Sequence, residues 1–281
     1  MNTKPSILYL TDFYYPAKGR KYHEEDLYII SELRNDFKII ICHPKDSKNH
    51  EEHVDLVIIR NTGSIMYFKE YFEEFVERVT IKSILTYNEM SGKGDMQGKQ
   101  HLLELTNQKY PVIPTIDSIL DIKILPPSDK YLLKLKDGAD SIGMKTATYE
   151  ELLNLNTQDY IIQPFVDFIH EVSFYYIDFE FQYALYAPNK TKRWDLEEYI
   201  PTKKDLVFAN KFIEWNSINH GIQRVDACLQ KNGELVLVEL EDLNPYLSLD
   251  ALTNSIRKQF IASFKTSLLK LLNTKLITHE L

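Results

Sequence analysis

Short apolar runs alternate with amphipathic segments along residues 1–90 of the chain. The runs at 7–10, 37–42, 54–59 and 84–87 have the length of strands, whereas 24–33 and 66–79 carry apolar residues at helical spacing. Strands that alternate with helices predict a parallel sheet with helices on its faces. The runs KIIICH and DLVIIR are nearly all apolar, which is typical of strands buried on both faces.

The pattern changes near residue 90, where the turn-rich connector SGKGD precedes a helix expected over 97–105. Further strands are expected at 131–134 and 160–163, long antiparallel strands within the aromatic segment 172–186, and a closing helix over 251–272. We therefore predict an α/β (α+β) fold in three parts. Residues 1–90 form an open parallel-sheet domain, residues 91–165 a small central cap, and residues 166–281 an antiparallel-sheet domain.

The segment from 223 to 250 contains two apolar strands joined by a tight Asn232-Gly233 turn, which predicts a β-hairpin. The hairpin brings Asp226 beside Glu239 and Glu241, which share a face because side chains alternate along a strand. Converging carboxylates repel one another unless a cation neutralises them, and Mg²⁺ is usually held by one or two carboxylates together with substrate phosphates. The hairpin thus predicts a magnesium–nucleotide site, with a solvated acidic turn as the alternative.

Composition and charge narrow the function classes. The chain has 281 residues, 44% of them hydrophobic and 26% charged, as in ordinary globular proteins. Its net charge of -8 disfavours a nucleic-acid binder, which needs a basic face. No apolar run reaches the roughly 18 residues of a membrane span, and no secretory signal is expected at the N-terminus. Cys42 and Cys228 lie in apolar runs and are expected to be free buried thiols, so we expect a cytoplasmic protein that binds neither nucleic acid nor membrane.

A lysine and a small-residue loop form a candidate phosphate site. Lys134 lies at the end of the apolar run YLLKLK and precedes the loop DGADSIG, whose backbone N–H groups can bind phosphate beside the ammonium group. Lys99 opens the helix that follows the connector. Lysines at strand ends and in first helical turns are also common on solvated surfaces, so neither residue decides the function alone.

A second candidate nucleotide contact lies between Gln163 and Glu171. Pro164 interrupts strand pairing and leaves backbone donors and acceptors free, so this bend could clamp a purine while Glu171 binds the ribose hydroxyls. A bend at the protein surface is the alternative.

Taken in order, these passages resemble the ATP-grasp superfamily, in particular its glutathione-synthetase-like and ribosomal-protein glutamate ligase branch. The resemblance covers nearly the whole chain. None of these motifs is specific alone, and the resemblance rests on their order: DLVIIRN, then GK with LLELTNQKYPVIPTI, then Lys134 with DGADSIGM, then IIQPFV with HEVS, then VDACLQKNGELVLVELEDLNP.

The resemblance implies ATP and Mg²⁺ as cofactors, with Mn²⁺ as a substitute. It implies a catalytic role for Arg193 over the transferred phosphoryl group. The implied ATP-binding residues are Lys99, Lys134, Ser141, Gly143, Gln163, Phe165, Val166 and Glu171, and the implied metal ligands are Asp226, Glu239, Glu241 and Asn244.

Three departures from the family pattern affect these roles. The family usually ends its hairpin with E-x-N, whereas Glu239-Leu240-Glu241 occupies this spacing here, so either Glu241 replaces the asparagine or Asn244 reaches the metal. Gln163 stands where an acid is common. The phosphate loop carries two aspartates, at 137 and 140, which would repel phosphate if they pointed inward.

The activity implied by the resemblance is ATP-dependent ligation, in which a carboxylate is activated as an acyl phosphate and an amine, less often a thiol, displaces phosphate. The substrates would be small molecules or peptides. Candidate substrate-binding residues are Arg20 and Lys21, in a loop that is equally consistent with a solvated surface, together with Arg60 and Arg224. Two alternatives stay open: an ATP-binding regulatory module without ligase activity, and a phosphoryl-transfer enzyme on the same scaffold. A homodimer or homotetramer also stays open.

Overall fold

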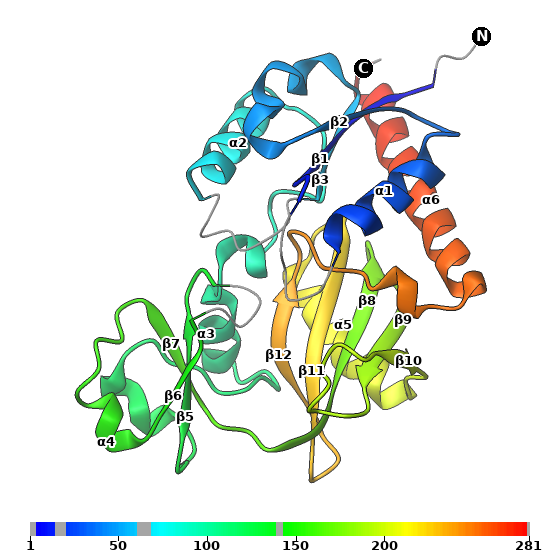
Figure 1. Cartoon of the computed structure of the whole chain (residues 1–281). Coiled ribbons are helices and arrows are strands. Elements are labelled where there is room, and N and C mark those ends of the chain that lie inside the picture. Colours follow the sequence, from blue (N-terminus) through cyan, green and yellow to red (C-terminus); the bar gives the residue numbers. More distant parts are fainter. Residues whose placement is uncertain (1–3, 15–20, 61–68, 139–142, 280–281) are drawn as a thin grey trace.

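The computed structural model describes residues 4–14, 21–60, 69–138 and 143–279, and side chains as far as residue 274. Its strands form three sheets, one in each of the segments 1–90, 91–165 and 166–281. Figure 1 shows the N-terminal sheet at the top, the larger C-terminal sheet below it, and the small central sheet at the lower left. The mixed α/β fold that the sequence predicts is confirmed.

The N-terminal sheet is parallel, with the strand order β2-β1-β3-β4. Its strands are β1 (Ser6–Thr11), β2 (Lys38–Cys42), β3 (Leu56–Arg60) and β4 (Thr86–Tyr87). The connections contain the helices α1 (Tyr22–Leu33) and α2 (Lys69–Ile81) and the short turns η1 (Pro44–Asn49) and η2 (Glu51–His53). The parallel sheet expected from alternating strands and helices is therefore confirmed.

One expectation about this sheet is wrong. β2 is an edge strand, and its Ile40 and Ile41 are 45% and 41% exposed, so the run KIIICH is not buried on both faces. β3 lies between β1 and β4 and is buried along its whole length, as the run DLVIIR predicts. An apolar run alone does not separate the two cases, because burial of a strand depends on its neighbours in the sheet.

The central part is an antiparallel sheet with the order β6-β5-β7, formed by β5 (Tyr131–Leu135), β6 (Lys145–Ala147) and β7 (Tyr160–Pro164). It carries α3 (Gln100–Asn107), α4 (Tyr149–Leu152), η4 (Asp95–Gln97) and η5 (Ile119–Ile124). The helix α3 begins later than 97 because Gly98 has a φ of +69° and ends η4. This positive φ is one that side chains rarely adopt, and an added Cβ would meet the Lys136 carbonyl at 3.0 Å, so glycine is favoured at this position.

The C-terminal sheet is antiparallel, with the order β10-β9-β8-β11-β12. Its strands are β8 (Phe168–Ile177), β9 (Glu180–Ala187), β10 (Glu197–Tyr199), β11 (Ile222–Gln230) and β12 (Leu235–Glu241). The long strands within 172–186 and the hairpin β11–β12 are as predicted. Helix α5 (Lys203–Asn216), the turn η6 (Leu249–Ala251) and helix α6 (Asn254–His279) complete this part.

The N-terminal and C-terminal parts share one hydrophobic core. Ile7 and Ile58 of the parallel sheet belong to the same buried cluster as Tyr175 of β8 and Phe264 of α6. Figure 1 shows α6 returning alongside α1, so the last helix of the chain closes the layer begun by the first. Within the described residues, no helix combines the length and the apolar character that crossing a membrane requires.

Candidate active site

Two neighbouring cavities lie between the central and C-terminal parts. The larger has a volume of about 550 Å³ and is lined by β8, β11, β12, the start of α3 and the loops after β9 and β12. The smaller, of about 220 Å³, lies between β5, β7 and β12. Both are lined by Lys99, Gly138, Glu171, Arg193, Val238 and Glu239, which mark the place where the cavities meet.

The strand register arranges the site in rows across the sheet. Asp226 of β11 pairs with Ser173 of β8 on one side and with Glu239 of β12 on the other. Arg224 likewise pairs with Tyr175 and Glu241, one row further from the smaller cavity. The position of Asp226 beside Glu239, and the shared face of Glu239 and Glu241, are therefore as the hairpin predicts. Successive rows on one face are roughly 7 Å apart, since each residue of a strand advances about 3.4 Å.

A β-bulge shapes this part of the hairpin. The register of β11 against β12 shifts between Asp226 and Ala227, so Val238 is an extra residue on β12. Both Val238 and its neighbour Glu239 line the two cavities. Bulges commonly re-aim side chains beside functional sites, and this one brings two consecutive residues to the same cavity wall.

An ion pair joins the cap to the hairpin where the cavities meet. Lys99, 6% exposed at the start of α3, donates to Glu239. Burial disfavours both charges, but Glu239 raises the pKa of Lys99, while Lys99 and Lys134 lower the pKa of Glu239. Burial lowers the pKa of Lys134 to about 8, although Glu239 opposes this shift.

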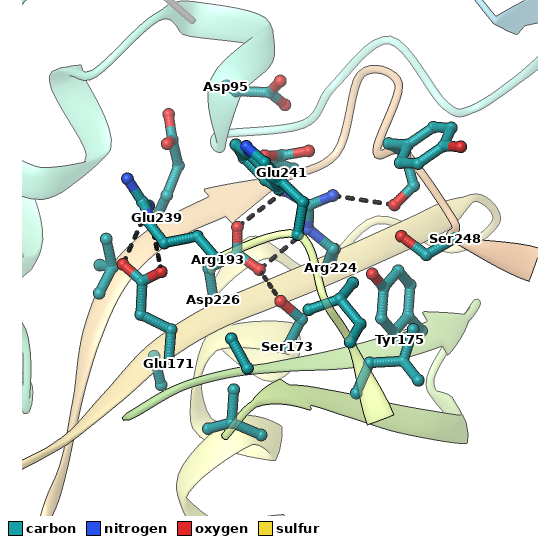
Figure 2. A pocket seen from close by; sticks show the side chains of 18 of the residues that line it. Asp95, Glu171, Ser173, Tyr175, Arg193, Arg224, Asp226, Glu239, Glu241 and Ser248 are labelled. Atoms are coloured by element: carbon teal, nitrogen blue, oxygen red, sulfur yellow. Dashed lines mark hydrogen bonds and ion pairs between the residues drawn. The ribbon is translucent and has the colours of Figure 1, made fainter. Parts of the chain in front are cut away.

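Arg193 lies on the loop between β9 and β10 and lines both cavities. Its Nε donates to Glu171 Oε2 at 2.7 Å and its Nη2 to Glu171 Oε1 at 2.9 Å. Figure 2 shows this pair beside Glu239. The predicted catalytic arginine and the predicted ribose ligand thus contact each other directly.

Arg224 occupies the centre of the acidic cluster. It donates to both carboxylate oxygens of Asp226, at 2.9 and 2.8 Å, to Glu241, and to the Tyr246 carbonyl at 2.9 Å. Asp226 also accepts from the Ser173 hydroxyl at 2.6 Å, as Figure 2 shows. The sequence suggested Arg224 as a substrate ligand, whereas here the guanidinium neutralises the carboxylates that the hairpin brings together.

The fit of a magnesium ion depends on these carboxylates. Within the described residues, no group of three or more His, Cys, Asp or Glu side chains is arranged to hold a metal. Asp226 and Glu239 remain a cross-strand pair on the cavity wall, each now balanced by a cationic side chain. Two carboxylates with hard oxygen donors fit an ion that keeps several waters and also binds phosphates. Glu241 is held by Arg224, and Asn244 lines the larger cavity.

Asp95 and Asp137 also line the larger cavity, and each has partners of its own within the protein. Burial raises the pKa of Asp95 well above its usual range, with Asp242 and Glu241 adding to the shift, and its Oδ1 accepts from the Asp242 and Leu243 amides at 2.7 and 2.9 Å. Asp137 pairs with Lys69 of α2 at 3.1 Å. Lys69 therefore partly balances the charge of Asp137.

The smaller cavity is mostly apolar, and the buried amide side chain of Gln163 belongs to its wall. Gln163 is fully buried, and its Nε2 donates to Thr115 Oγ1 at 2.8 Å. The Thr115 hydroxyl donates in turn to the Ile113 carbonyl at 2.8 Å, which fixes the direction of both bonds. Gln163 Oε1 has no hydrogen-bond partner among the described residues. The remaining wall includes Leu132, Met144, Phe165, Val166 and Cys228.

Several predicted residues do not reach the site. Arg60 is 2% exposed, bonds Glu25, Asp26 and the Pro245 carbonyl, and lines neither cavity, so a direct substrate contact is not supported. Lys21 pairs with Glu24 at 2.8 Å on the surface. Gly143 has a φ of +71° and packs against Leu135, without lining a cavity. Arg20, Asp140 and Ser141 lie outside the described residues.

Other residues at the site were not predicted. Cys228 follows Asp226 and Arg224 at the alternating spacing of β11, which already places it on the cavity face. His101 is 1% exposed and links Gly98, at 3.0 Å, to the Leu240 amide, at 3.3 Å. Nothing in the sequence marks His101, because its two partners belong to different parts of the fold.

Comparisons with known proteins identify the fold. No protein-family profile and no curated protein sequence matches the chain. Among solved structures, D-cycloserine synthetase DcsG has a TM-score of 0.73 at 16% identity, covering 95% of this chain and 99% of its own. The D-alanine–D-alanine ligase from Bacillus anthracis complexed with ATP has a TM-score of 0.67 at 12% identity, covering 96% of each chain. The ATP-grasp ligase PsnB complexed with a minimal precursor has a TM-score of 0.65 at 11% identity, covering 94% of this chain and 100% of its own. The chain therefore has the fold of the ATP-grasp superfamily.

Proposed function

We propose that the chain is an ATP-dependent ligase that joins a carboxylate to an amine through an acyl phosphate. The observation that carries the proposal is the pair of adjoining cavities that meet at Lys99, Glu239 and Arg193. A nucleotide in the smaller cavity would direct its γ-phosphate to this meeting point, and the larger cavity would hold the substrates. The solved ligases with this fold, among them one bound to ATP, support the same reaction class.

The smaller cavity suits adenine in particular. Because the amide nitrogen of Gln163 donates to Thr115, Oε1 is left as a buried acceptor beside this cavity, without a partner among the described residues. This acceptor would bind the exocyclic amino group of adenine, whereas the carbonyl oxygen of guanine would face another acceptor. The family's acid and this glutamine supply the same acceptor atom, so the departure at Gln163 does not weaken the proposal.

The lysines and carboxylates at the meeting point suit the phosphates. Lys99 and Lys134 would bind phosphate oxygens, and Asp226 with Glu239 would hold Mg²⁺. Bound Mg²⁺ would neutralise negative charge on the phosphates during transfer. Lys99 would then exchange part of its contact with Glu239 for a contact to phosphate, which a buried lysine beside a metal-binding carboxylate can do without moving its backbone.

We propose that the Arg193 guanidinium contacts the transferred phosphoryl group. Its side chain is 39% exposed, and it borders both cavities from a loop that is not part of a strand. Once the ribose hydroxyls occupy Glu171, the guanidinium would be available to the charge that develops on the phosphoryl oxygens. Preorganised donors at that position commonly supply a large share of phosphoryl-transfer catalysis.

The reaction balances without a protein nucleophile. A carboxylate oxygen attacks the γ-phosphorus, the bond to the bridging oxygen breaks, and ADP leaves. The amine then attacks the acyl carbon, the carbon–oxygen bond to phosphate breaks, and phosphate leaves while the amine loses a proton. The substrates would be small molecules or peptides, since one solved ligase with this fold is complexed with a precursor peptide.

The experiment is a screen for the carboxylate and amine. Thermal unfolding is measured with Mg-ADP and panels of small carboxylates, and the compounds that raise Tm are tested for phosphate release from ATP. Ligation predicts phosphate release that needs both a carboxylate and an amine, with an amide product. A phosphorylated stable product would support the phosphoryl-transfer alternative, and nucleotide binding without turnover would support the regulatory module.

A further inference from the structure

A buried charge cluster connects the N-terminal sheet to the loop at residues 244–251. Glu25 and Asp26 of α1 are 7% and 0% exposed, and Arg60 of β3 is 2% exposed. Asp26 accepts from Arg60 Nε at 3.0 Å and from the Tyr9 hydroxyl at 3.0 Å. Two carboxylates and one guanidinium do not balance, and buried ionic clusters are weak sources of stability. Stability alone therefore does not explain why this cluster is buried against the loop.

Three hydrogen bonds join this cluster to the backbone of the loop. Glu25 Oε1 accepts from the Leu247 amide at 2.9 Å, and Glu25 Oε2 accepts from the Leu249 amide at 3.1 Å. Arg60 Nη1 donates to the Pro245 carbonyl at 2.8 Å. Arg60 Nη2 also bonds Glu25 Oε1, at 3.1 Å, so the two side chains act on the loop as one unit.

The bonded residues alternate with residues that face the site. The side chains of this loop that line the larger cavity include Asn244, Tyr246, Ser248 and Asp250. Between them, Leu247 and Leu249 are buried in the shared core. Figure 2 shows Ser248 and Tyr175 on the side of the cavity away from Glu171.

Ser248 has the backbone conformation that these bonds hold. Its φ of 52° and ψ of 41° are left-handed, which is uncommon for a residue with a side chain. Such conformations persist only where the surroundings determine them. The two amides bound by Glu25 belong to the residues immediately before and after Ser248.

We propose that Glu25 and Arg60 are positioning residues for the acceptor side of the site. By acceptor side we mean the end of the larger cavity, at Tyr246 and Ser248, that would hold the carboxylate and amine substrates. The Glu25 carboxylate binds the amides on both sides of Ser248 and so fixes Tyr246 and Ser248 toward the cavity. Arg60 orients that carboxylate and holds the loop at Pro245. The assignment of this end to the acceptor rests on the proposed function, whereas the fixing of the loop does not.

The two loop bonds are strongest with the ionised carboxylate. Protonation turns one carboxyl oxygen into an O–H donor with reduced capacity to accept, which weakens its bond to the loop amide. Burial raises the pKa of Glu25 to about 7, Arg60 and the two amides oppose the shift, and Asp26 adds to it. The charged and titratable groups that act on Glu25 are Arg60 of β3, Asp26 of α1, Tyr9 of β1, Tyr175 of β8 and Tyr183 of β9. Burial keeps these tyrosines neutral by raising their pKa.

Loop order and global stability therefore respond differently to pH. The folded-state pKa of Glu25 lies above its ordinary value of 4.5, so this group stabilises the fold below that value and loses its contribution as pH rises through about 7. The loop bonds follow the opposite course and weaken as pH falls through about 7. If Glu25 only stabilised the fold, loop order and global stability would change with pH in the same direction.

Hydrogen–deuterium exchange of the segment 245–251 tests the proposal in the full-length protein. At pH 8 we expect protected amides, and at pH 6 exchange on the order of tenfold faster after correction for the chemical rate, the equivalent of one hydrogen bond. Glu25→Gln offers one oxygen acceptor and sets an N–H donor against the other amide, so its segment should exchange fast at both pH values. Its Tm at pH 8 should not fall, because the variant removes an unbalanced buried charge. Glu24→Gln, one residue away on the surface, is the control and should match the wild type.

The outcomes separate this proposal from the proposed function. Exchange that does not depend on pH in the wild type, or protection that survives in Glu25→Gln at pH 8, overturns it. If Glu25→Gln does not fold, the wild-type pH series alone decides. Mg-ADP binding is measured on the same samples, and unchanged binding with a loosened loop supports assignment to the acceptor side. Loss of Mg-ADP binding together with loop protection overturns that assignment. A protein that shows the predicted exchange but has no ligase activity refutes only the proposed function.

Discussion

Lys99 and Glu239 form an ion pair that joins the start of α3 to the hairpin strand β12. The pair lies where the two cavities meet, and His101 bonds the backbone on both sides of it, at Gly98 and Leu240. The burial of Lys99 makes its charge dependent on this carboxylate. The same two residues therefore join the cap to the sheet, and in the proposed function they would contact phosphate and metal.

Glu239→Gln should destabilise the protein. The substitution leaves Lys99 buried without its carboxylate, and an unsatisfied buried group costs about 1–3 kcal/mol or more if charged. Adding Lys99→Met should recover most of this loss, because the uncompensated charge is then absent. Urea unfolding measures both, with the exposed Glu234→Gln in the same hairpin as the control. A double variant less stable than Glu239→Gln would show that Lys99 has other essential partners.

Arg193→Ala should lower kcat much more than it weakens ATP binding. If the guanidinium stabilises charge on the transferred phosphoryl group, the expected loss in kcat is on the order of 10²–10³-fold, similar to removing one preorganised donor. Arg193→Lys should rescue poorly, since an ammonium group lacks the planar fork that binds Glu171 at two positions. Steady-state kinetics and nucleotide titration decide between the roles. A small change in kcat with a large rise in the Kd for ATP would make Arg193 a ground-state binding residue.

Gln163 should set the preference for adenine over guanine. Gln163→Met removes the buried acceptor beside the smaller cavity that we propose for adenine, so ATP affinity should fall about tenfold, the equivalent of one buried hydrogen bond. GTP affinity should stay the same or rise, because the acceptor that faces its carbonyl oxygen is gone. Calorimetric titration with both nucleotides gives the ratio, and the exposed Gln158→Met is the control. An unchanged ratio would place the base elsewhere.

Nucleotide affinity should depend on the charge of Lys134. Burial lowers its pKa to about 8, so the ammonium form is lost above this pH and Mg-ATP binding should weaken there. Stability follows the opposite trend between about pH 8 and 10.5, because the unfolded chain then binds more protons than the folded one and stability rises with pH. Lys134→Arg should bind Mg-ATP with little pH dependence over this range. Equal pH profiles for both proteins would remove Lys134 from the phosphate site.

The sequence predicted correctly those contacts that depend on local pattern alone. Strand alternation and the Asn232-Gly233 turn predicted that Asp226 lies beside Glu239, and the register confirms it. The same reasoning could not foresee that Arg224 would neutralise Asp226 and Glu241, because alternation places Arg224 on that face without saying which way its long side chain turns.

Contacts between distant segments account for what the sequence did not predict. Arg60 was expected to bind substrate, in a run that resembles a family strand ending in arginine. It is instead paired with Glu25, which precedes it by 35 residues, and with the Pro245 carbonyl, 185 residues further on. β2 was expected to be buried because its apolar run resembles that of β3, yet only the order of strands in the sheet decides which of the two lies at the edge.

Oxygen-isotope labelling tests whether the reaction passes through an acyl phosphate. The carboxylate that most stimulates phosphate release is labelled with ¹⁸O and incubated with the protein, Mg-ATP and the amine. An acyl phosphate transfers one carboxylate oxygen to phosphorus, so we expect one ¹⁸O atom in the released phosphate and an amide product. Phosphate without the label, or a label retained in a stable phosphorylated product, would contradict ligation through an acyl phosphate.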